Sequence, residues 1–329
     1  MVRTAVIGTG TWGTGISVVL ARAGADDIYL WGRREDKPHE IDSRRVHPNL
    51  PGCRLPDAVR VTNDTAGIAA ADLVLWAVPT PFSAAMAAEL AGALPPDVPI
   101  VSLAKGIEQR SLRTVTQILA DHFGERPYGC ISGPTHAEEV VHGLHTGVAA
   151  AGPRDLLELL VERIHQPTFR VYAVEDLLGV ELCGALKNVI AVAAGICDGL
   201  GLGDNTKATL ITRGLAEMRR LGRAMGARDA TFAGLAGIGD LLTTCYSGHG
   251  RNRALGMAAA AGKTAQQYMD EVGMVAEGAW TCRAAVTLGR EHKVELPIAS
   301  QVESVLWAGK PVAAAISELV SRTAKEEEP

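Results

Sequence analysis

The stretch Thr4-Ala5-Val6-Ile7-Gly8-Thr9-Gly10-Thr11-Trp12-Gly13 decides the fold of this chain. Its first four residues are typical of a buried strand, and a helical pattern over residues 13–23 follows the glycines. The G-x-G-x-x-G motif between them permits a sharp turn and the close approach of a pyrophosphate to the backbone. The helix would present free N–H groups and a partial positive charge to that anion. This context predicts a βαβ unit that binds a dinucleotide rather than an ordinary glycine turn.

The second predicted strand bears on the choice of cofactor. It spans residues 27–31 and is followed by Gly32-Arg33-Arg34, with no acidic residue before Glu35. An acid at this point would bind the ribose 2′-hydroxyl of NAD, whereas two arginines suit the 2′-phosphate of NADP. A solvated basic turn is the alternative interpretation. We expect NADP(H) to be favoured, with use of NAD(H) also compatible with the sequence.

Strand and helix patterns alternate through the first half of the chain. Further strands are predicted over residues 59–62, 72–78, 98–103, 128–132, 147–151 and 169–173. After about Val174 the strand patterns end, and helices are predicted over residues 176–196, 206–225, 252–261 and 278–292. The expected fold class is α/β: an N-terminal Rossmann-type, doubly wound and mostly parallel sheet over residues 1–180, and a C-terminal all-helical domain over residues 181–329.

Composition excludes several classes of protein. The 329 residues are 47% hydrophobic, and 32 basic against 37 acidic residues give a net charge of −5. No global positive field would attract phosphate backbones, so we expect no nucleic-acid partner. The six cysteines form no C-x-x-C pair, which favours free thiols in a reducing cytoplasm. No signal peptide is evident, and the longest uncharged run, residues 73–88, contains two prolines, so no membrane span is expected.

Two lysines stand in positions that suggest chemistry. Lys187 is the only charged residue between Glu181 and Asp198. Such a charge is costly in an apolar helix unless it is paired or serves a site, and desolvation would lower its pKa toward the range of a proton donor or acceptor. Lys105 follows the strand over residues 98–103, and ligands of open α/β sheets lie beyond the carboxyl ends of strands. The alternatives are a lysine that extends to solvent at the helix edge and a surface lysine after a strand.

Polar residues gather between residues 237 and 253. Asp240 could orient an ammonium group, Arg251 could bind a phosphate dianion through two N–H groups, and Asn252 adds amide donors. Taken alone, the stretch could be a charged loop that leads into a helix. Thr135 and Glu138 have the form of a capping box after the strand at 128–132. No metal-binding spacing and no G-x-S-x-G motif occur, so neither a metal site nor a serine nucleophile is expected.

Several long motifs in order resemble one family, the NAD(P)-dependent glycerol-3-phosphate dehydrogenases of the bacterial biosynthetic type. The resemblance runs from about Thr4 to Lys310. Its motifs are the glycine stretch 8–13, Ala104-Lys105-Gly106, Ile131-Ser132-Gly133-Pro134-Thr135, Gly184-Ala185-Leu186-Lys187-Asn188-Val189-Ile190-Ala191, Thr212-Arg213-Gly214-Leu215-Ala216-Glu217-Met218, Gly239-Asp240-Leu241, Arg251-Asn252-Arg253 and Val275-Ala276-Glu277-Gly278.

The resemblance implies reversible reduction of dihydroxyacetone phosphate to sn-glycerol 3-phosphate, which feeds glycerophospholipid synthesis, and a homodimer. It implies Lys187 as proton donor or acceptor, with Lys105 and Asp240 as further catalytic residues. The implied substrate-binding residues are Lys105, Gly133, Thr135, Lys187, Asn188, Asp240, Thr244, Gly250, Arg251 and Asn252. The implied cofactor-binding residues are Gly8, Gly10, Thr11, Trp12, Gly13, Arg33, Arg34, Lys105, Ala137, Arg251, Val275 and Glu277.

The sequence departs from the family pattern at two positions. Thr11 replaces a frequent serine and keeps the hydroxyl, whereas Gly250 replaces a frequent serine and loses a side-chain contact to the substrate phosphate. A dehydrogenase of hydroxyacids with the same cofactor domain is one rival hypothesis, and Asp240, Arg251 and Asn252 favour a phosphate monoester over it. A non-catalytic dinucleotide sensor is another, and it would be expected to lack the proton-transfer lysine.

Overall fold

The computed structural model describes residues 2–33, 38–248, 250–323 and 326. The chain forms two compact units: unit 1 comprises Met1–Ala104 and Val115–Leu177, and unit 2 comprises Lys105–Thr114 and Leu178–Pro329. The segment Lys105–Thr114 thus lies inside the sequence range expected for the first domain but belongs to the second unit. Hydrogen bonds explain this placement, since the Thr114 hydroxyl donates to Glu181 at 2.7 Å and the Asn188 amide donates to the Lys105 carbonyl at 2.8 Å.

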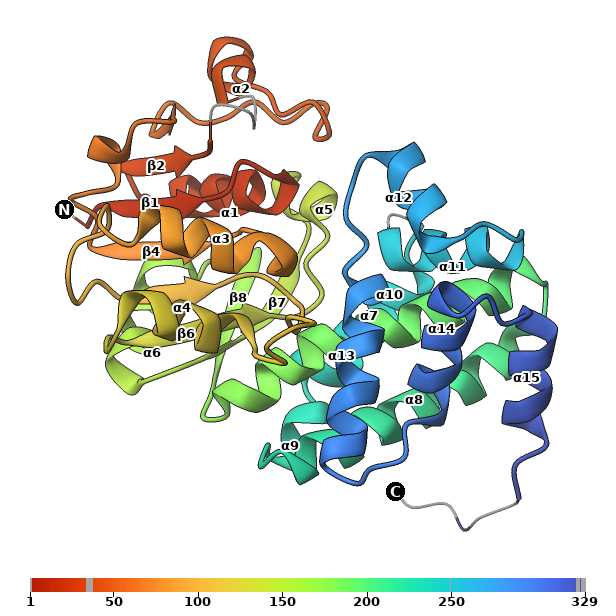
Figure 1. Cartoon of the computed structure of the whole chain (residues 1–329). Coiled ribbons are helices and arrows are strands. Elements are labelled where there is room, and N and C mark those ends of the chain that lie inside the picture. Colours follow the sequence, from red (N-terminus) through yellow and green to blue (C-terminus); the bar gives the residue numbers. More distant parts are fainter. Residues whose placement is uncertain (1, 34–37, 249, 324–325, 327–329) are drawn as a thin grey trace. The chain divides into compact units, whose positions relative to one another are not determined.

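Unit 1 is built on an eight-stranded sheet with the order β3-β2-β1-β4-β5-β6-β7-β8. All neighbouring strands run parallel except β6 and β7, which are antiparallel, so the predicted doubly wound and mostly parallel sheet is confirmed (Figure 1). The strands are β1 (Thr4–Ile7), β2 (Ile28–Trp31), β3 (Val59–Thr62), β4 (Leu73–Trp76), β5 (Ile100–Ser102), β6 (Tyr128–Ser132), β7 (Thr146–Ala151) and β8 (Phe169–Val174).

Both faces of this sheet are buried, because alternate residues of each strand point to opposite sides. Leu73 and Leu75 of β4 pack in one apolar cluster with α1 (Thr11–Arg22) and α6 (Arg154–Ile164). Val74 and Trp76 pack in the other with α3 (Thr80–Leu90) and α4 (Val115–Phe123). The shorter helices of the unit are α2 (Pro38–Arg44), η2 (Thr65–Gly67) and α5 (Ala137–Val141).

The glycine-rich turn lies where the strand order reverses, between β1 and β4. Gly8 has φ +116°, and a Cβ there would approach the backbone of Ala77, just after β4, to 3.0 Å. A Cβ on Gly13 would lie 1.9 Å from the Gly8 carbonyl oxygen. Only glycine allows the turn and the first turn of α1 to pack this closely. Ligands of open α/β sheets bind at this kind of switch point.

Apart from the segment Lys105–Thr114, the described residues of unit 2 form helices and their connections, organised around α7 (Leu177–Gly199), whose residues 179–197 are all buried. By length and composition α7 is apolar enough to cross a membrane, but 89% of its most apolar window is buried inside the protein, as in a core helix. The other helices are α8 (Gly203–Ala224), α9 (Asp229–Phe232), η3 (Leu235–Gly239), α10 (Asp240–Tyr246), α11 (Arg251–Ala260), α12 (Ala265–Val272), α13 (Glu277–Glu291), α14 (Pro297–Trp307) and α15 (Val312–Val320).

A buried carboxylate joins two of these helices. Glu217 of α8 is 4% exposed and accepts hydrogen bonds from the backbone N–H groups of Ile298 and Ala299, at 2.7 and 3.2 Å. These groups lie in the first turn of α14, where N–H groups have no partner within the helix. Burial raises the pKa of Glu217 to about 7, since desolvation of the charged form outweighs the two hydrogen bonds.

We predict that Glu217→Gln removes a pH dependence of stability. Because the folded-state pKa lies above the ordinary value of 4.5, the folded chain holds a proton that the unfolded chain has released between pH 4.5 and about 7. The stabilisation of the wild type relative to the variant is therefore largest near pH 4.5 and falls by up to about 3 kcal/mol as the pH rises to 8. Urea unfolding across this range measures the difference. The exposed Glu291→Gln is the matched control, and a difference independent of pH would show that Glu217 titrates normally.

Candidate functional site

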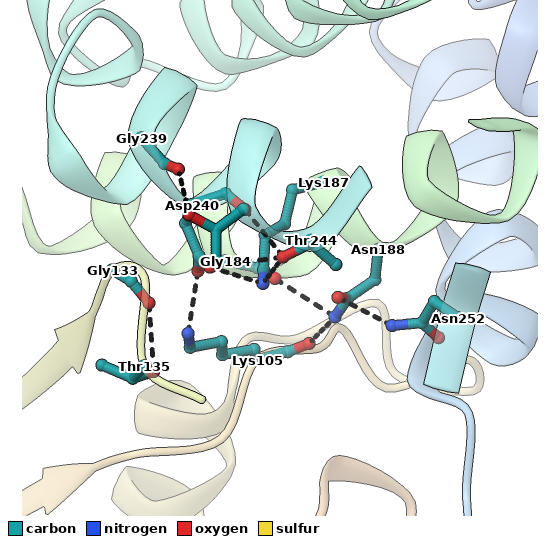
Figure 2. A network of polar contacts seen from close by, with 11 residues as sticks. Lys105, Gly133, Thr135, Gly184, Lys187, Asn188, Gly239, Asp240, Thr244 and Asn252 are labelled. Atoms are coloured by element: carbon teal, nitrogen blue, oxygen red, sulfur yellow. Dashed lines mark hydrogen bonds and ion pairs between the residues drawn. The ribbon is translucent and has the colours of Figure 1, made fainter. Parts of the chain in front are cut away.

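The centre of unit 2 holds one carboxylate shared by two lysines. Asp240 accepts a hydrogen bond from Lys187 Nζ on Oδ1 at 2.8 Å and one from Lys105 Nζ on Oδ2 at 2.8 Å (Figure 2). The Asp240 and Lys187 side chains are 2% and 6% exposed, whereas that of Lys105 is 14% exposed. Each ammonium group therefore forms an ion pair with a different oxygen of one buried carboxylate.

Three segments hold these side chains. Lys187 lies in the middle of α7, Lys105 begins the segment Lys105–Thr114, and Asp240 begins α10. The short π-helical turn η3 leads into α10 and is kinked at Gly237, where a Cβ would lie 2.0 Å from the Phe232 carbonyl oxygen. Such turns are frequent at functional sites. Here the kink allows the chain to enter α10 with Asp240 in its first turn.

Burial and the three charges set the ionisation of the site. Desolvation lowers the pKa of Lys187 to about 8; the charge of Lys105 acts in the same direction, and Asp240 opposes both. Burial alone would raise the pKa of Asp240, but the two lysines outweigh it and hold that pKa below the usual range. Lys187 is thus a cation that can release a proton near neutral pH, beside a carboxylate that remains ionised.

Thr244 completes the coordination of Lys187. Its hydroxyl accepts a hydrogen bond from Lys187 Nζ at 2.6 Å and donates to the Asp240 carbonyl oxygen at 2.7 Å, one turn earlier in α10. An ammonium has three N–H donors, and two of those on Lys187 are used by described residues, so one remains for a ligand. The fixed partners orient the Nζ atom.

A chain of amides extends from this cluster. Asn188 donates to the Lys105 carbonyl oxygen at 2.8 Å, and Asn252 donates to the Asn188 side-chain oxygen at 2.9 Å. Asn252 in turn accepts from the backbone N–H of Gly278 at 2.9 Å. A Cβ on Gly278 would lie 2.5 Å from the Asn188 carbonyl oxygen, so this approach of α13 to α7 requires glycine. The amides tie α7, α11 and α13 together beside Lys105.

The start of α11 is a positive, uncapped helix end. Gly250 is its N-cap residue, no side chain caps it, and its first turn has no acidic residue. Arg251 is exposed and donates to the Val275 carbonyl oxygen at 3.0 Å, and Val275 and Glu277 are half-buried. Backbone N–H groups at a helix start and a guanidinium are the groups that bind phosphates in proteins, and Asn252 lies on the same turn.

The residues expected to bind the cofactor phosphates form a cradle in unit 1. Gly10 is the N-cap residue of α1, no side chain caps the helix, and a Cβ on Gly10 would meet no atom within 4 Å. An open, uncapped helix start after a glycine turn is the feature that binds a pyrophosphate in dinucleotide-binding folds. Half-buried Thr11 begins α1, and half-buried Arg33 follows β2. Arg34, the other arginine of the predicted 2′-phosphate site, lies outside the described residues.

Trp12 and Ala137 lie together in unit 1. Both belong to one apolar cluster with Val18, Leu50 and Val141. The Trp12 indole N–H is buried and has no hydrogen-bond partner among the described residues. A buried donor of this kind calls for a partner, and a polar ligand could supply one. Together with the glycine turn, it supports the fit of a dinucleotide to this unit.

The predicted capping box at Thr135 is wrong. The helix α5 begins at Ala137 with His136 as its N-cap residue, and no side chain caps it. Thr135 lies one residue too early, and its hydroxyl donates to the Gly133 carbonyl oxygen at 3.0 Å instead. Gly133 follows β6 with φ +145°, a conformation that favours glycine. Both residues therefore stand in a tight turn at the carboxyl end of a strand.

Sequence reasoning missed the partners of several site residues. Neither the bond between Thr114 and Glu181 nor a second ion cluster, Asp198 with Lys207 and Arg253, was anticipated. The only signal was that Asp198 and Glu181 are the charges flanking the apolar run around Lys187. No group of three or more His, Cys, Asp or Glu side chains that could hold a metal occurs in the described part of the chain.

Two family models match the chain in sequence order. The model for the "NAD-dependent glycerol-3-phosphate dehydrogenase N-terminus" matches residues 3–156, and the model for the C-terminus of the same enzymes matches residues 176–317. The glycerol-3-phosphate dehydrogenase (NAD(P)+) of Desulfitobacterium hafniense is 42% identical over 329 residues, which cover 99% of this chain and 93% of that protein. The protein of the same name from Geobacillus kaustophilus is 44% identical, with coverage of 99% and 96%.

A solved structure agrees with these matches. The crystal structure of glycerol-3-phosphate dehydrogenase from Coxiella burnetii is similar with a TM-score of 0.93 and 34% sequence identity, and the match covers 97% of this chain and 99% of that chain. Family and fold thus agree over nearly the full length.

We predict that Asp240→Asn destabilises the protein at pH 7 by about 3 kcal/mol, because buried Lys187 and half-buried Lys105 then lack their shared counter-charge. The loss should be smaller at pH 9, where Lys187 gives up its proton more easily. Urea unfolding at both pH values measures it, with the exposed Asp204→Asn as the control for removal of a carboxylate. Equal stability of wild type and Asp240→Asn at pH 7 would mean that the ion cluster contributes nothing to the fold.

Proposed function

Since the chain belongs to the family of NAD-dependent glycerol-3-phosphate dehydrogenases, we propose that it reduces dihydroxyacetone phosphate reversibly to sn-glycerol 3-phosphate with NAD(P)H. The cluster of Lys187, Asp240 and Lys105 is the observation that carries the proposal. It combines a proton donor whose pKa lies near neutrality with a second fixed positive charge.

Lys187 supplies the proton in this reaction. A bound nicotinamide would supply or accept the hydride at the substrate carbon. The remaining N–H of Lys187 donates to the carbonyl oxygen, stabilises the negative charge that develops there and transfers its proton to it. In the reverse direction, neutral Lys187 accepts the hydroxyl proton. Asp240 and Thr244 keep the Nζ atom in place throughout, and Lys105 binds the substrate and adds positive charge.

The start of α11 binds the substrate phosphate. Arg251 pairs with two phosphate oxygens, and backbone N–H groups of the uncapped helix end donate to others. Gly250 contributes its backbone in place of the family's serine hydroxyl. Asn252 and Asn188 orient the substrate beside Lys105. Binding of the non-reacting phosphate provides the energy that orients the carbonyl group.

The glycine turn and its surroundings bind the dinucleotide. Gly8, Gly10 and Gly13 admit the pyrophosphate to the N-terminus of α1, with Thr11 and Trp12 beside it. Arg33, together with Arg34, binds the 2′-phosphate and favours NADP(H). By the family resemblance, we assign Ala137, Val275, Glu277 and Lys105 to cofactor binding and Gly133 and Thr135 to substrate binding. The enzyme is a cytoplasmic homodimer, and its product supplies glycerophospholipid synthesis.

The proposal is tested by oxidation of NADPH and of NADH, each with dihydroxyacetone phosphate and with unphosphorylated dihydroxyacetone. We predict rapid oxidation with the phosphorylated substrate and a value of kcat/KM at least about 100-fold lower without the phosphate, since remote binding energy is lost. The kcat/KM for NADPH should exceed that for NADH.

The Lys187→Met variant is the control for contaminating activity. It should bind the dinucleotide like the wild type, measured by cofactor fluorescence, and show no turnover. Equal rates with and without the substrate phosphate would contradict the assignment of α11. If the folded wild type binds the dinucleotide but oxidises neither cofactor with dihydroxyacetone phosphate, the proposed substrate is wrong. Hydroxyacids would then be the next substrates to test.

A further inference from the structure

A second ion cluster in unit 2 repeats the pattern of one carboxylate between two cations. Asp198, near the end of α7, accepts from Lys207 Nζ of α8 at 2.9 and 2.8 Å on its two oxygens. Its Oδ2 atom also accepts from the Nε atom of Arg253 on α11. Asp198 thus joins three helices, and the reaction proposed above does not use it.

Burial makes this cluster energetically significant. The Lys207 side chain is 7% exposed, and those of Asp198 and Arg253 are 21% and 22% exposed. Partly buried ion pairs are screened less than surface pairs, and the hydrogen bonds of this cluster are oriented. The cluster therefore restrains the helices that carry it, whereas an exposed pair contributes little.

The cluster contacts the C-terminal end of the helix that carries Asp240. Lys207 Nζ lies 4.4 Å from the ring centroid of Tyr246, the last residue of α10, whose first residue is Asp240. Cys245 precedes Tyr246 in α10 and is fully buried. It interacts electrostatically with the charged groups of both clusters. The two clusters thus share α7, and Lys207 of the second cluster contacts the last residue of α10.

Arg253 links the cluster to the residues that are proposed to bind the substrate phosphate. It follows Arg251 and Asn252 in the first turn of α11. Backbone contacts hold the same turn against α7, since a Cβ on Gly195 would lie 2.0 Å from the Arg253 carbonyl oxygen. This contact has no directional bond. The ion pair with Asp198 adds a directional bond to the one that Asn252 makes with Asn188, and the two together fix the rotation of the turn about the helix axis.

We propose that Asp198 is a positioning residue for substrate binding: by holding Arg253, it sets the orientation in which Arg251 and Asn252 meet the substrate phosphate. The inference rests on the proposed function of α11 and adds a residue that contacts no substrate. In this proposal, Lys207 keeps the Asp198 carboxylate ionised and in place.

Arg253→Gln and Asp198→Asn test the proposal, with the exposed Asp204→Asn as the matched control for loss of a carboxylate. Arg253→Gln leaves Asp198 and Lys207 paired, so it remains informative if Asp198→Asn fails to fold. We expect both variants to raise the KM for dihydroxyacetone phosphate about tenfold, with kcat changed less than about twofold and the KM for NADPH raised less than that for dihydroxyacetone phosphate, because Arg251 is also an implied cofactor contact. The double variant should be no worse than Asp198→Asn alone, because the two residues act as one unit. Asp204→Asn should behave like the wild type.

Hydrogen exchange provides a readout that needs no activity. The amides of residues 251–256 should exchange about tenfold faster in Arg253→Gln, while those of α14 remain unchanged. If the wild type is inactive with dihydroxyacetone phosphate but Arg253→Gln still speeds this exchange, the proposed function is wrong, whereas the role of the Asp198–Arg253 ion pair in holding the first turn of α11 is supported. An unchanged KM, additive effects in the double variant, or a uniform loss of kcat and of both KM values would overturn the positioning role.

Discussion

The candidate active site depends on a single carboxylate with two ammonium groups. Removing three charges from water is expensive, and such an arrangement is stable only where each charge has fixed, hydrogen-bonded partners. Asp240 meets this condition because α7, α10 and the segment Lys105–Thr114 each bring one charged group to it. The partly compensated burial leaves Lys187 easier to deprotonate than an ordinary lysine. The same interaction therefore links the packing of unit 2 to its proposed proton transfer.

Much of the surrounding structure follows from the need to keep this cluster in place. A lysine can stay in the middle of the most apolar helix only because Asp240 and Thr244 satisfy it. The helices that flank α7 approach it closely through glycines, and the amide chain from Asn188 to Gly278 uses that closeness. Rigid elements thus hold the reacting groups, as electrostatic preorganisation requires.

Local patterns in the sequence predicted the elements but not their long-range partners. All eight strands were identified, because short and nearly continuous apolar runs mark strands that are buried on both faces of a sheet. Lys187 was identified as a buried charge for the same local reason. The bond between Lys187 and Asp240 spans 53 positions, and the bond between Lys105 and Asp240 spans 135. Local patterns in a single sequence do not reveal pairs of residues that are so far apart along the chain. The grouping of Lys105–Thr114 with unit 2, the buried Glu217 and the Asp198 cluster were missed for this reason, and the capping box failed by one residue at a helix start.

The most direct test of the shared carboxylate is a titration of the Lys187 ammonium by NMR of isotopically labelled lysine side chains, in the wild type, Lys105→Met and Asp240→Asn. If the three charges are coupled as the distances indicate, the wild-type midpoint lies near pH 8, and it rises without Lys105 and falls without Asp240. A wild-type midpoint at the ordinary lysine value of 10.5, unchanged in both variants, would contradict the coupling and with it the role of Lys187 as the proton donor.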